Sequence, residues 1–308
     1  MNKKLFLIFI IFSSCYRVPN KIEPKISYSI EEKYIENMAS PFPLLTEEEK
    51  REDWGKEYMI ASSFAKNLDL YRAISTYKRS LILLQNKDIE RKKEIEYFII
   101  LSYFLGKKYK DVIDHFENSS LKNVDKSFPT FSDLLVILYE SYKNENILDK
   151  KEAIEKVLSK EFPSIYKNLN ISSAIFEADL EELSKKKNEK LSDFLKRYNS
   201  KKKSVSQAQF LNAILPGAGY LYLGQKRSAL TTILLNGSFI AASYEFFKRG
   251  YIAAGIITTS FEMGWYFGAI YGAGEEAKFY NERIYEEEAN AFMKKEKLFP
   301  FFNLKYSF

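Results

Sequence analysis

The sequence predicts an all-α protein in which a domain of helical repeats precedes a transmembrane helical hairpin. Apolar residues recur three or four positions apart through much of the chain, which is the period of a helix. Two such segments align at a constant offset of 39 in the numbering. Two apolar stretches, 229–247 and 251–274, follow in the C-terminal half and reach the length that spans a bilayer.

The composition of the chain excludes several classes of partner and site. The chain has 308 residues, 46% of them hydrophobic, which is ample for a packed core. Its net charge of +6 is mild and its lysines are spread among glutamates, so no nucleic-acid partner is expected. Cys15 and His115 are the single cysteine and histidine, which excludes an intrachain disulfide and a Cys/His zinc site. His115 has no nucleophile motif near it, and we predict no catalytic residue, metal or cofactor.

Residues 1–14 are typical of a signal peptide. Two lysines precede an apolar run that is too short to span a bilayer, and Ser13 and Ser14 follow it. "FSSC" resembles a bacterial lipobox, with Phe12 in place of the usual leucine, and this resemblance implies lipidation at Cys15. The alternative is a plain signal peptide or an uncleaved anchor in which Cys15 is incidental. Both predict the bacterial cell envelope.

Residues 15–48 are proline-rich and predict a tether, and residues 49–162 predict helical repeats. "YMIASSFAKNLDLYRAISTY" and "YFIILSYFLGKKYKDVIDHF" each predict a helix, a polar turn and a second helix. The offset matches six pairs of residues: Tyr58 with Tyr97, Ile60 with Ile99, Phe64 with Tyr103, Leu70 with Tyr109, Ile74 with Ile113 and Tyr77 with Phe116. A degenerate third copy extends from Phe131 to Phe162.

"YRAISTYKRSL" places Ala73, Ile74, Tyr77 and Leu81 where a tetratricopeptide repeat has its small and large residues, and the two units resemble that family. They depart from it in being longer than its repeat of about 34 residues. The second unit also carries Val112 at a small-residue position. Such repeats imply a concave surface that binds a partner protein. The alternative is a compact helical bundle without a groove.

Residues 163–204 predict a basic helical linker. Its lysines and arginine cluster between Lys185 and Lys203, just before the apolar segments. The cluster predicts either a contact with anionic lipid headgroups or a solvated helix face.

Residues 205–274 predict a membrane elbow and the hairpin. In "LNAILPGAGYLYLGQ" the helix breakers Pro216, Gly217, Gly219 and Gly224 indicate a sharp turn that leads into the first apolar stretch. Breakers are tolerated in a membrane only where protein or water covers the backbone. A phosphate-binding loop is excluded because Tyr222 stands where its third glycine would be, and no Walker lysine follows.

The hairpin contains polar residues and a glycine strip. Asn236, Glu245 and Glu262 are the predicted intramembrane polar residues, and such acids are functional candidates. Gly264, Gly268 and Gly272 recur at every fourth position, which predicts close approach of the elbow helix or of a second copy in a homo-oligomer. The alternative is that these glycines only relieve crowding beside Trp265 and Tyr266.

"ILPGAGYLYLGQ", "LLNGSFIAASYE" and residues 262–281 are similar to the C-terminal membrane module of uncharacterised bacterial envelope proteins that pair tetratricopeptide-like helices with a Pro-Gly-x-Gly hairpin. The elbow also resembles the start of the TM2-type hairpin domain. Residues 275–308 predict an amphipathic helix leaving the membrane and an aromatic tail, "FPFFNLKYSF", that we expect at the membrane interface.

Together these features predict a non-enzymatic, membrane-anchored scaffold of the cell envelope. Its repeats, expected in the periplasm, would bind another envelope protein, and membrane lipid would be its second partner. The alternative is a membrane enzyme or transporter component that uses Glu245, Glu262 and Asn236. A proton-dependent activity in liposomes would favour the alternative.

Overall fold

The computed structural model describes residues 18–28, 38–85, 87–186 and 188–308, and every regular element within these ranges is helical. The all-α fold class predicted from the sequence is therefore confirmed. The predicted signal peptide and Cys15 lie outside the described residues. The described residues divide into two compact units, one made of those within 18–26 and 174–292 and the other of those within 27–173 and 293–308.

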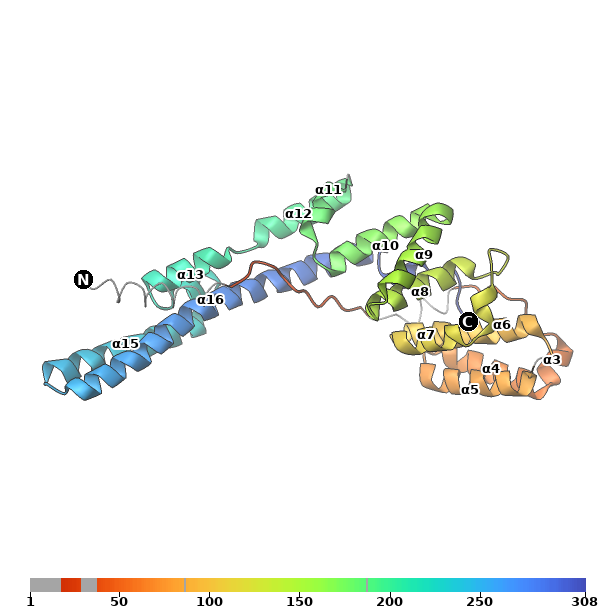
Figure 1. Cartoon of the computed structure of the whole chain (residues 1–308), viewed down its shortest axis with the longest axis horizontal. Coiled ribbons are helices and arrows are strands. Elements are labelled where there is room, and N and C mark those ends of the chain that lie inside the picture. Colours follow the sequence, from red (N-terminus) through yellow and green to blue (C-terminus); the bar gives the residue numbers. More distant parts are fainter. Residues whose placement is uncertain (1–17, 29–37, 86, 187) are drawn as a thin grey trace. The chain divides into compact units, whose positions relative to one another are not determined.

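The second of these, called the repeat unit, is a succession of helix pairs (Figure 1). Its elements are α3 (Glu47–Arg51), α4 (Asp53–Lys66), α5 (Leu70–Leu84), α6 (Ile89–Leu105), α7 (Tyr109–Glu117), α8 (Phe131–Asn144), α9 (Leu148–Glu161) and the 3-10 turns η1 (Ser120–Asn123) and η2 (Pro300–Asn303). From α4 to α9, each helix packs against the next one in the chain.

The same turn joins the helices of each pair. Leu68, Lys107 and Asn146 have left-handed φ values of 53°, 55° and 57° and follow one another at equal spacing along the chain. In each turn the following N–H donates to the carbonyl oxygen of the fifth residue before it at 2.9 Å, the bond that closes a Schellman motif. The spacing equals the offset found in the sequence, and the third turn lies between α8 and α9, within the degenerate third copy.

One core contains most of the residues that the offset matches. Tyr58, Phe64, Ile74, Tyr77, Tyr97, Tyr103, Ile113 and Phe116 are all buried in it or packed against it. Ile60 differs, because its side chain is 48% exposed whereas that of Ile99 is fully buried. The difference arises because α4 belongs to the first helix pair, and a terminal pair leaves one face in solvent.

The other unit, called the hairpin unit, holds the C-terminal apolar segments. Its elements are α11 (Leu180–Lys185), α12 (Glu189–Lys201), α13 (Val205–Ile214), α14 (Ala218–Tyr222), α15 (Lys226–Lys248) and most of α16 (Ile252–Lys295), and α10 (Pro163–Phe176) ends in it. α15 and α16 lie side by side as an antiparallel hairpin (Figure 1). α16 continues through Gly274 without a break, so the second apolar stretch and the segment that follows it form one helix.

In the part of the chain that the structure describes, no helix has both the length and the apolarity required to cross a membrane. The sequence prediction of two bilayer-spanning helices is therefore not supported.

The aromatic tail, residues 299–308, does not lie where the sequence suggested. Instead of facing a membrane interface, it packs into the repeat unit, and Leu304 and Phe308 are part of the core. Phe299 and Phe301 are buried as well and pack against Tyr28, with ring centroids 4.7 and 5.4 Å away. The composition of the tail indicated burial in an apolar environment but not which one.

Candidate functional site

The elbow, residues 211–225, is held by the side chain of Asn212. Its Oδ1 accepts hydrogen bonds from the N–H groups of Gly217 (2.8 Å) and Gly219 (3.3 Å). Pro216 has no N–H to satisfy and occupies the turn between α13 and α14. Asn212 is 1% exposed, so the elbow is built around a buried polar group that the sequence analysis did not single out.

The elbow glycines are required by close packing and by backbone conformation. Gly217 has a φ of +95°, and a Cβ atom there would lie 2.7 Å from the carbonyl oxygen of Ala229 on α15. At Gly219 a Cβ atom would lie 2.3 Å from the carbonyl oxygen of Ala208 and 2.9 Å from Cβ of Ala273 on α16. Gly224 has a φ of +79° but open space around it, so only its conformation favours glycine. The elbow therefore joins α13, α15 and α16.

The inner side of the hairpin is a narrow polar seam. The buried residues of α15 are Ala229, Asn236 and Ser243, each at the seventh position after the one before. Because a heptad makes about two helical turns, these side chains share one side of the helix. On α16, Gly255 and Glu262 are buried with the same spacing. No large apolar side chain occupies any of these five positions.

Asn236 and Glu262 are predicted to lie at the same level of this seam. Along the chain they are equally far from Arg249 in the turn, one before it and the other after it, and antiparallel helices rise equally per residue. Among the described residues, Asn236 Oδ1 and Glu262 Oε2 are buried without a hydrogen-bond partner. Asn236 Nδ2 donates to the carbonyl oxygen of Thr232 at 2.8 Å. A mutual contact through the two free oxygens, with Glu262 protonated, stays a prediction.

Glu245 has a different environment. Its Oε1 accepts a hydrogen bond from Nε of Arg249 at 2.6 Å, and both side chains are exposed. The predicted set of three polar residues thus separates into a buried pair and a surface ion pair beside the turn.

The outer side of the hairpin unit is strongly apolar. Among the described residues, 28 large hydrophobic side chains are exposed, and 20 of them lie between residues 210 and 279. They include Leu234 (59% exposed), Ile257 (58%) and Phe261 (60%). A water-soluble helix pair buries its apolar stripe and exposes its polar one, so the distribution here is the reverse.

The predicted glycine strip divides into two parts. A Cβ atom at Gly272 would lie 2.5 Å from the hydroxyl oxygen of Tyr220 on α14, so the elbow helix covers this end. Cβ atoms at Gly264 and Gly268 would have no described atom within 4 Å. That part of the strip is open on the outer side of α16.

The basic linker is largely paired with acids. Arg197 and Lys201 both contact Glu288 of α16, at 2.8 and 2.6 Å. Further ion pairs link Lys185 with Glu181, Lys186 with Glu182 and Lys196 with Asp193. These contacts favour the solvated helix face over a surface dedicated to anionic lipid.

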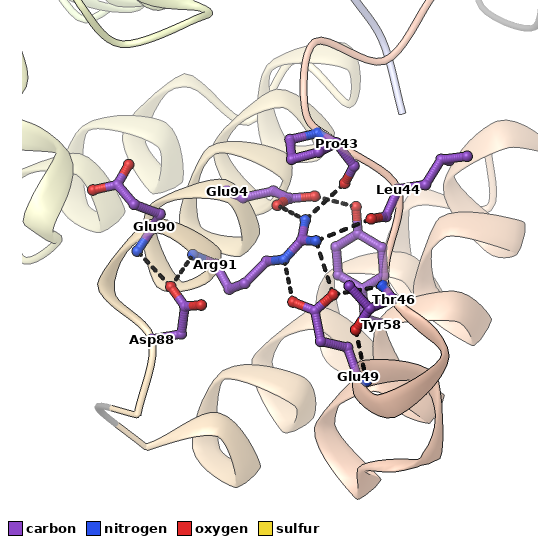
Figure 2. Close-up of polar contacts among 9 residues, drawn as sticks. All are labelled: Pro43, Leu44, Thr46, Glu49, Tyr58, Asp88, Glu90, Arg91 and Glu94. Carbon is purple, nitrogen blue, oxygen red and sulfur yellow. Dashed lines mark hydrogen bonds and ion pairs between the residues drawn. The ribbon is translucent and has the colours of Figure 1, made fainter.

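The repeat unit contains a buried ionic cluster around Arg91 that the sequence analysis missed (Figure 2). Nε of Arg91 donates to Glu49 Oε1 at 2.7 Å, and its two terminal nitrogens donate to Glu49, to Glu94 and to the carbonyl oxygens of Pro43 and Leu44. All five N–H groups of the guanidinium are thus used, so the cluster stabilises the fold and leaves no donor for a ligand. It attaches the segment before α4 to α6.

His115 is a half-buried residue of α7. Burial, and to a lesser extent the charge of Lys78, lowers the pKa of His115 to about 4. It borders a cavity of about 250 Å³ that Lys78, Tyr103, Asp111, Asp114 and Asn118 also line. No group of histidine, cysteine and acidic side chains that could hold a metal occurs within the described ranges.

No protein-family model, curated protein or solved structure shows a significant match to this chain.

Proposed function

We propose that this protein is a non-enzymatic scaffold that attaches to a membrane of the cell envelope and uses its helical repeats to bind another envelope protein. The observation that carries the proposal is the hairpin unit, which has a polar seam inside and, on its outer side, 20 of the 28 large hydrophobic side chains that are exposed among the described residues. Apolar surfaces of this extent mark membrane or protein contacts. Polar groups sheltered between helices are characteristic of lipid-facing helix pairs.

Lipid is the occupant we propose for the outer side of the hairpin. The exposed apolar residues surround both α15 and α16 rather than forming one stripe, and a single docked helix would cover only one side. The ion pair of Glu245 with Arg249 and the adjacent Lys248 put charge at the hairpin turn, where lipid headgroups can solvate it.

The helix pairs support the second part of the proposal. Their turn recurs at one constant spacing, and each helix packs on its neighbour, as in tetratricopeptide-like arrays. Such arrays present an extended surface to a protein partner. We therefore place partner binding in the repeat unit and membrane attachment in the hairpin unit and at a lipidated Cys15.

The alternative of a membrane enzyme or transporter component depends on the buried pair of Asn236 and Glu262. Both side chains are enclosed between two helices, at 2% and 9% exposure. This enclosure favours a role in holding the hairpin together over a role in moving a solute.

Flotation of the purified full-length chain with liposomes tests membrane attachment. We expect the chain to float with the vesicles, and Leu234→Lys with Ile257→Lys to reduce the floating fraction several-fold. Ile82→Lys is the matched control, since Ile82 is 73% exposed but lies in the repeat unit. If the wild-type chain and all variants float to the same extent, or if none of them floats, the proposal is contradicted. Crosslinking in intact cells through the repeat unit tests partner binding separately.

A further inference from the structure

Two helices of the repeat unit are covered on all sides. In α6 the consecutive residues 97–101 are buried, and in α8 all residues from 132 to 142 are buried. Consecutive residues of a helix point in every direction, so burial of this kind requires cover on both faces. By contrast, α9 buries only Leu158. Neighbouring helices pack on α6 and α8. Phe42, before α3, and the C-terminal tail also contact these two helices.

The C-terminal tail supplies part of that cover. Asp133 Oδ2 on α8 accepts hydrogen bonds from the backbone N–H groups of Lys305 (2.8 Å) and Tyr306 (3.0 Å). The ring of Phe308 packs against Phe98 of α6, with centroids 5.6 Å apart. The N–H of Ser307 donates to the carbonyl oxygen of Ala39, so the tail also lies beside the N-terminal segment.

This mode of contact is that of a bound peptide. After η2 the tail has no regular structure, and a buried carboxylate recognises two successive backbone N–H groups of it. Burial raises the pKa of the Asp133 carboxyl, and the two N–H groups act in the opposite direction. The backbone N–H groups of the segment bound here therefore favour the carboxylate form of Asp133, against the effect of burial.

The tail also fits its place imperfectly. Asn303 Nδ2 and Ser307 Oγ are buried without a hydrogen-bond partner among the described residues. An unpaired buried polar group weakens binding relative to a group that is paired or apolar. A peptide with better-matched side chains at these two positions would bind the same surface more tightly.

We propose that the tail is an internal ligand that occupies the partner-binding surface on α6 and α8, and that this surface takes an extended aromatic peptide whose backbone N–H groups bind Asp133. The proposal rests on the proposed function, in which the repeat unit binds a protein partner. It adds the class of ligand, the recognising residue, and a competition between the tail and the partner.

Peptide exchange in the full-length chain tests this. A protease site inserted after Lys297, which is exposed, allows the tail to be cut from α16 without removing it. A fluorescently labelled FPFFNLKYSF peptide is then titrated and followed by anisotropy. We expect saturable binding to the cut chain and roughly 100-fold weaker binding to the uncut chain, because a tethered tail competes at high effective concentration.

Two variants examine the role of Asp133. Asp133→Asn should weaken binding to the cut chain about tenfold, and Asp114→Asn, at an exposed position of α7, is the matched control. A peptide methylated on the backbone nitrogen that corresponds to Lys305 should bind as weakly as the wild-type peptide binds Asp133→Asn, without any change to the protein.

The results that would overturn the proposal are distinct. A cut chain that stays folded but never exchanges its tail would show that the tail is a fixed part of the core. So would a cut chain that unfolds and is not restored by excess peptide, whereas restoration supports the proposal. Equal binding by Asp133→Asn would exclude the recognition that we assign. Liposome flotation and cellular crosslinking of the uncut chain would be unaffected by these failures, so the proposed function is tested independently.

Discussion

His115 is the single histidine of the chain, and burial lowers its pKa to about 4 from an ordinary value of 6.5. A histidine with a depressed folded-state pKa stabilises the fold while it is neutral. Its contribution is present above pH 6.5 and is lost as the pH falls toward 4. We expect the free energy of unfolding to fall across this range by at most about 3.5 kcal/mol, since each pKa unit corresponds to about 1.4 kcal/mol. Urea unfolding at pH values from 8 to 4 measures this free energy. An equally large fall with pH in His115→Gln would contradict its assignment to His115.

Arg91 shows how one residue can hold two segments together. Replacing it with methionine leaves Glu94, whose side chain is 2% exposed, without its cation, and loss of one partner of a buried ion pair costs about 3–5 kcal/mol. Lys56→Met is the control, because Lys56 pairs with Asp53 at the surface, where such pairs contribute under about 1 kcal/mol. Fluorescence of the buried Trp54 follows unfolding of this unit. Similar losses in both variants would show that the cluster is not a stabilising centre.

At the level of elements, the sequence predicted the helices and their pairing better than their surroundings. Helical periodicity and the constant offset were sufficient because each depends on neighbouring residues. The ionic cluster around Arg91 and the hydrogen bonds of Asn212 were not predicted, because they join positions that only the folded chain brings together. The position of the tail was not predicted for a different reason. Its apolar composition indicates that it is buried but does not indicate the surface against which it packs.

The elbow glycines give an element-scale prediction. In Gly219→Ala the new Cβ atom would meet the backbone carbonyl of Ala208 at 2.3 Å, so the packing of α13, α14 and α16 must shift. Overpacking of this kind costs about 1–3 kcal/mol. Gly264→Ala, where a Cβ atom would have no described neighbour within 4 Å, should be neutral or slightly stabilising in the monomer. Thermal unfolding in detergent compares them, and equal effects would argue against the elbow packing. A marked loss of self-association in Gly264→Ala alone would instead indicate a homo-oligomer formed through the open strip.

The seam of the hairpin gives a second prediction at the scale of elements. If Asn236 and Glu262 lie at one level, cysteines placed at both positions should form a crosslink within a single chain when Cys15 is replaced by serine. Cysteines at Asn236 and Gly255 are the matched control, since Gly255 lies two turns from Glu262 along α16 and this pair should not react. Mass spectrometry of the oxidised chain distinguishes the two pairs. Crosslinking of the control pair alone would show that the helices are shifted in register.

At the scale of the whole molecule, the proposed scaffold has two attachments to the membrane, a lipid at Cys15 and the apolar exterior of the hairpin unit. A single acyl chain binds membranes only marginally, and stable attachment takes a second signal. Cys15→Ser should therefore abolish incorporation of labelled fatty acid yet leave most of the protein in the membrane fraction. Leu234→Lys with Ile257→Lys should weaken attachment while the acyl label is retained. The combination should release the protein completely, because no attachment then remains. Acyl label retained by Cys15→Ser would refute lipidation there, since the chain has no second cysteine. Full release by Cys15→Ser alone would show that the hairpin does not hold the membrane, and its apolar exterior would then have to be assigned to a protein partner.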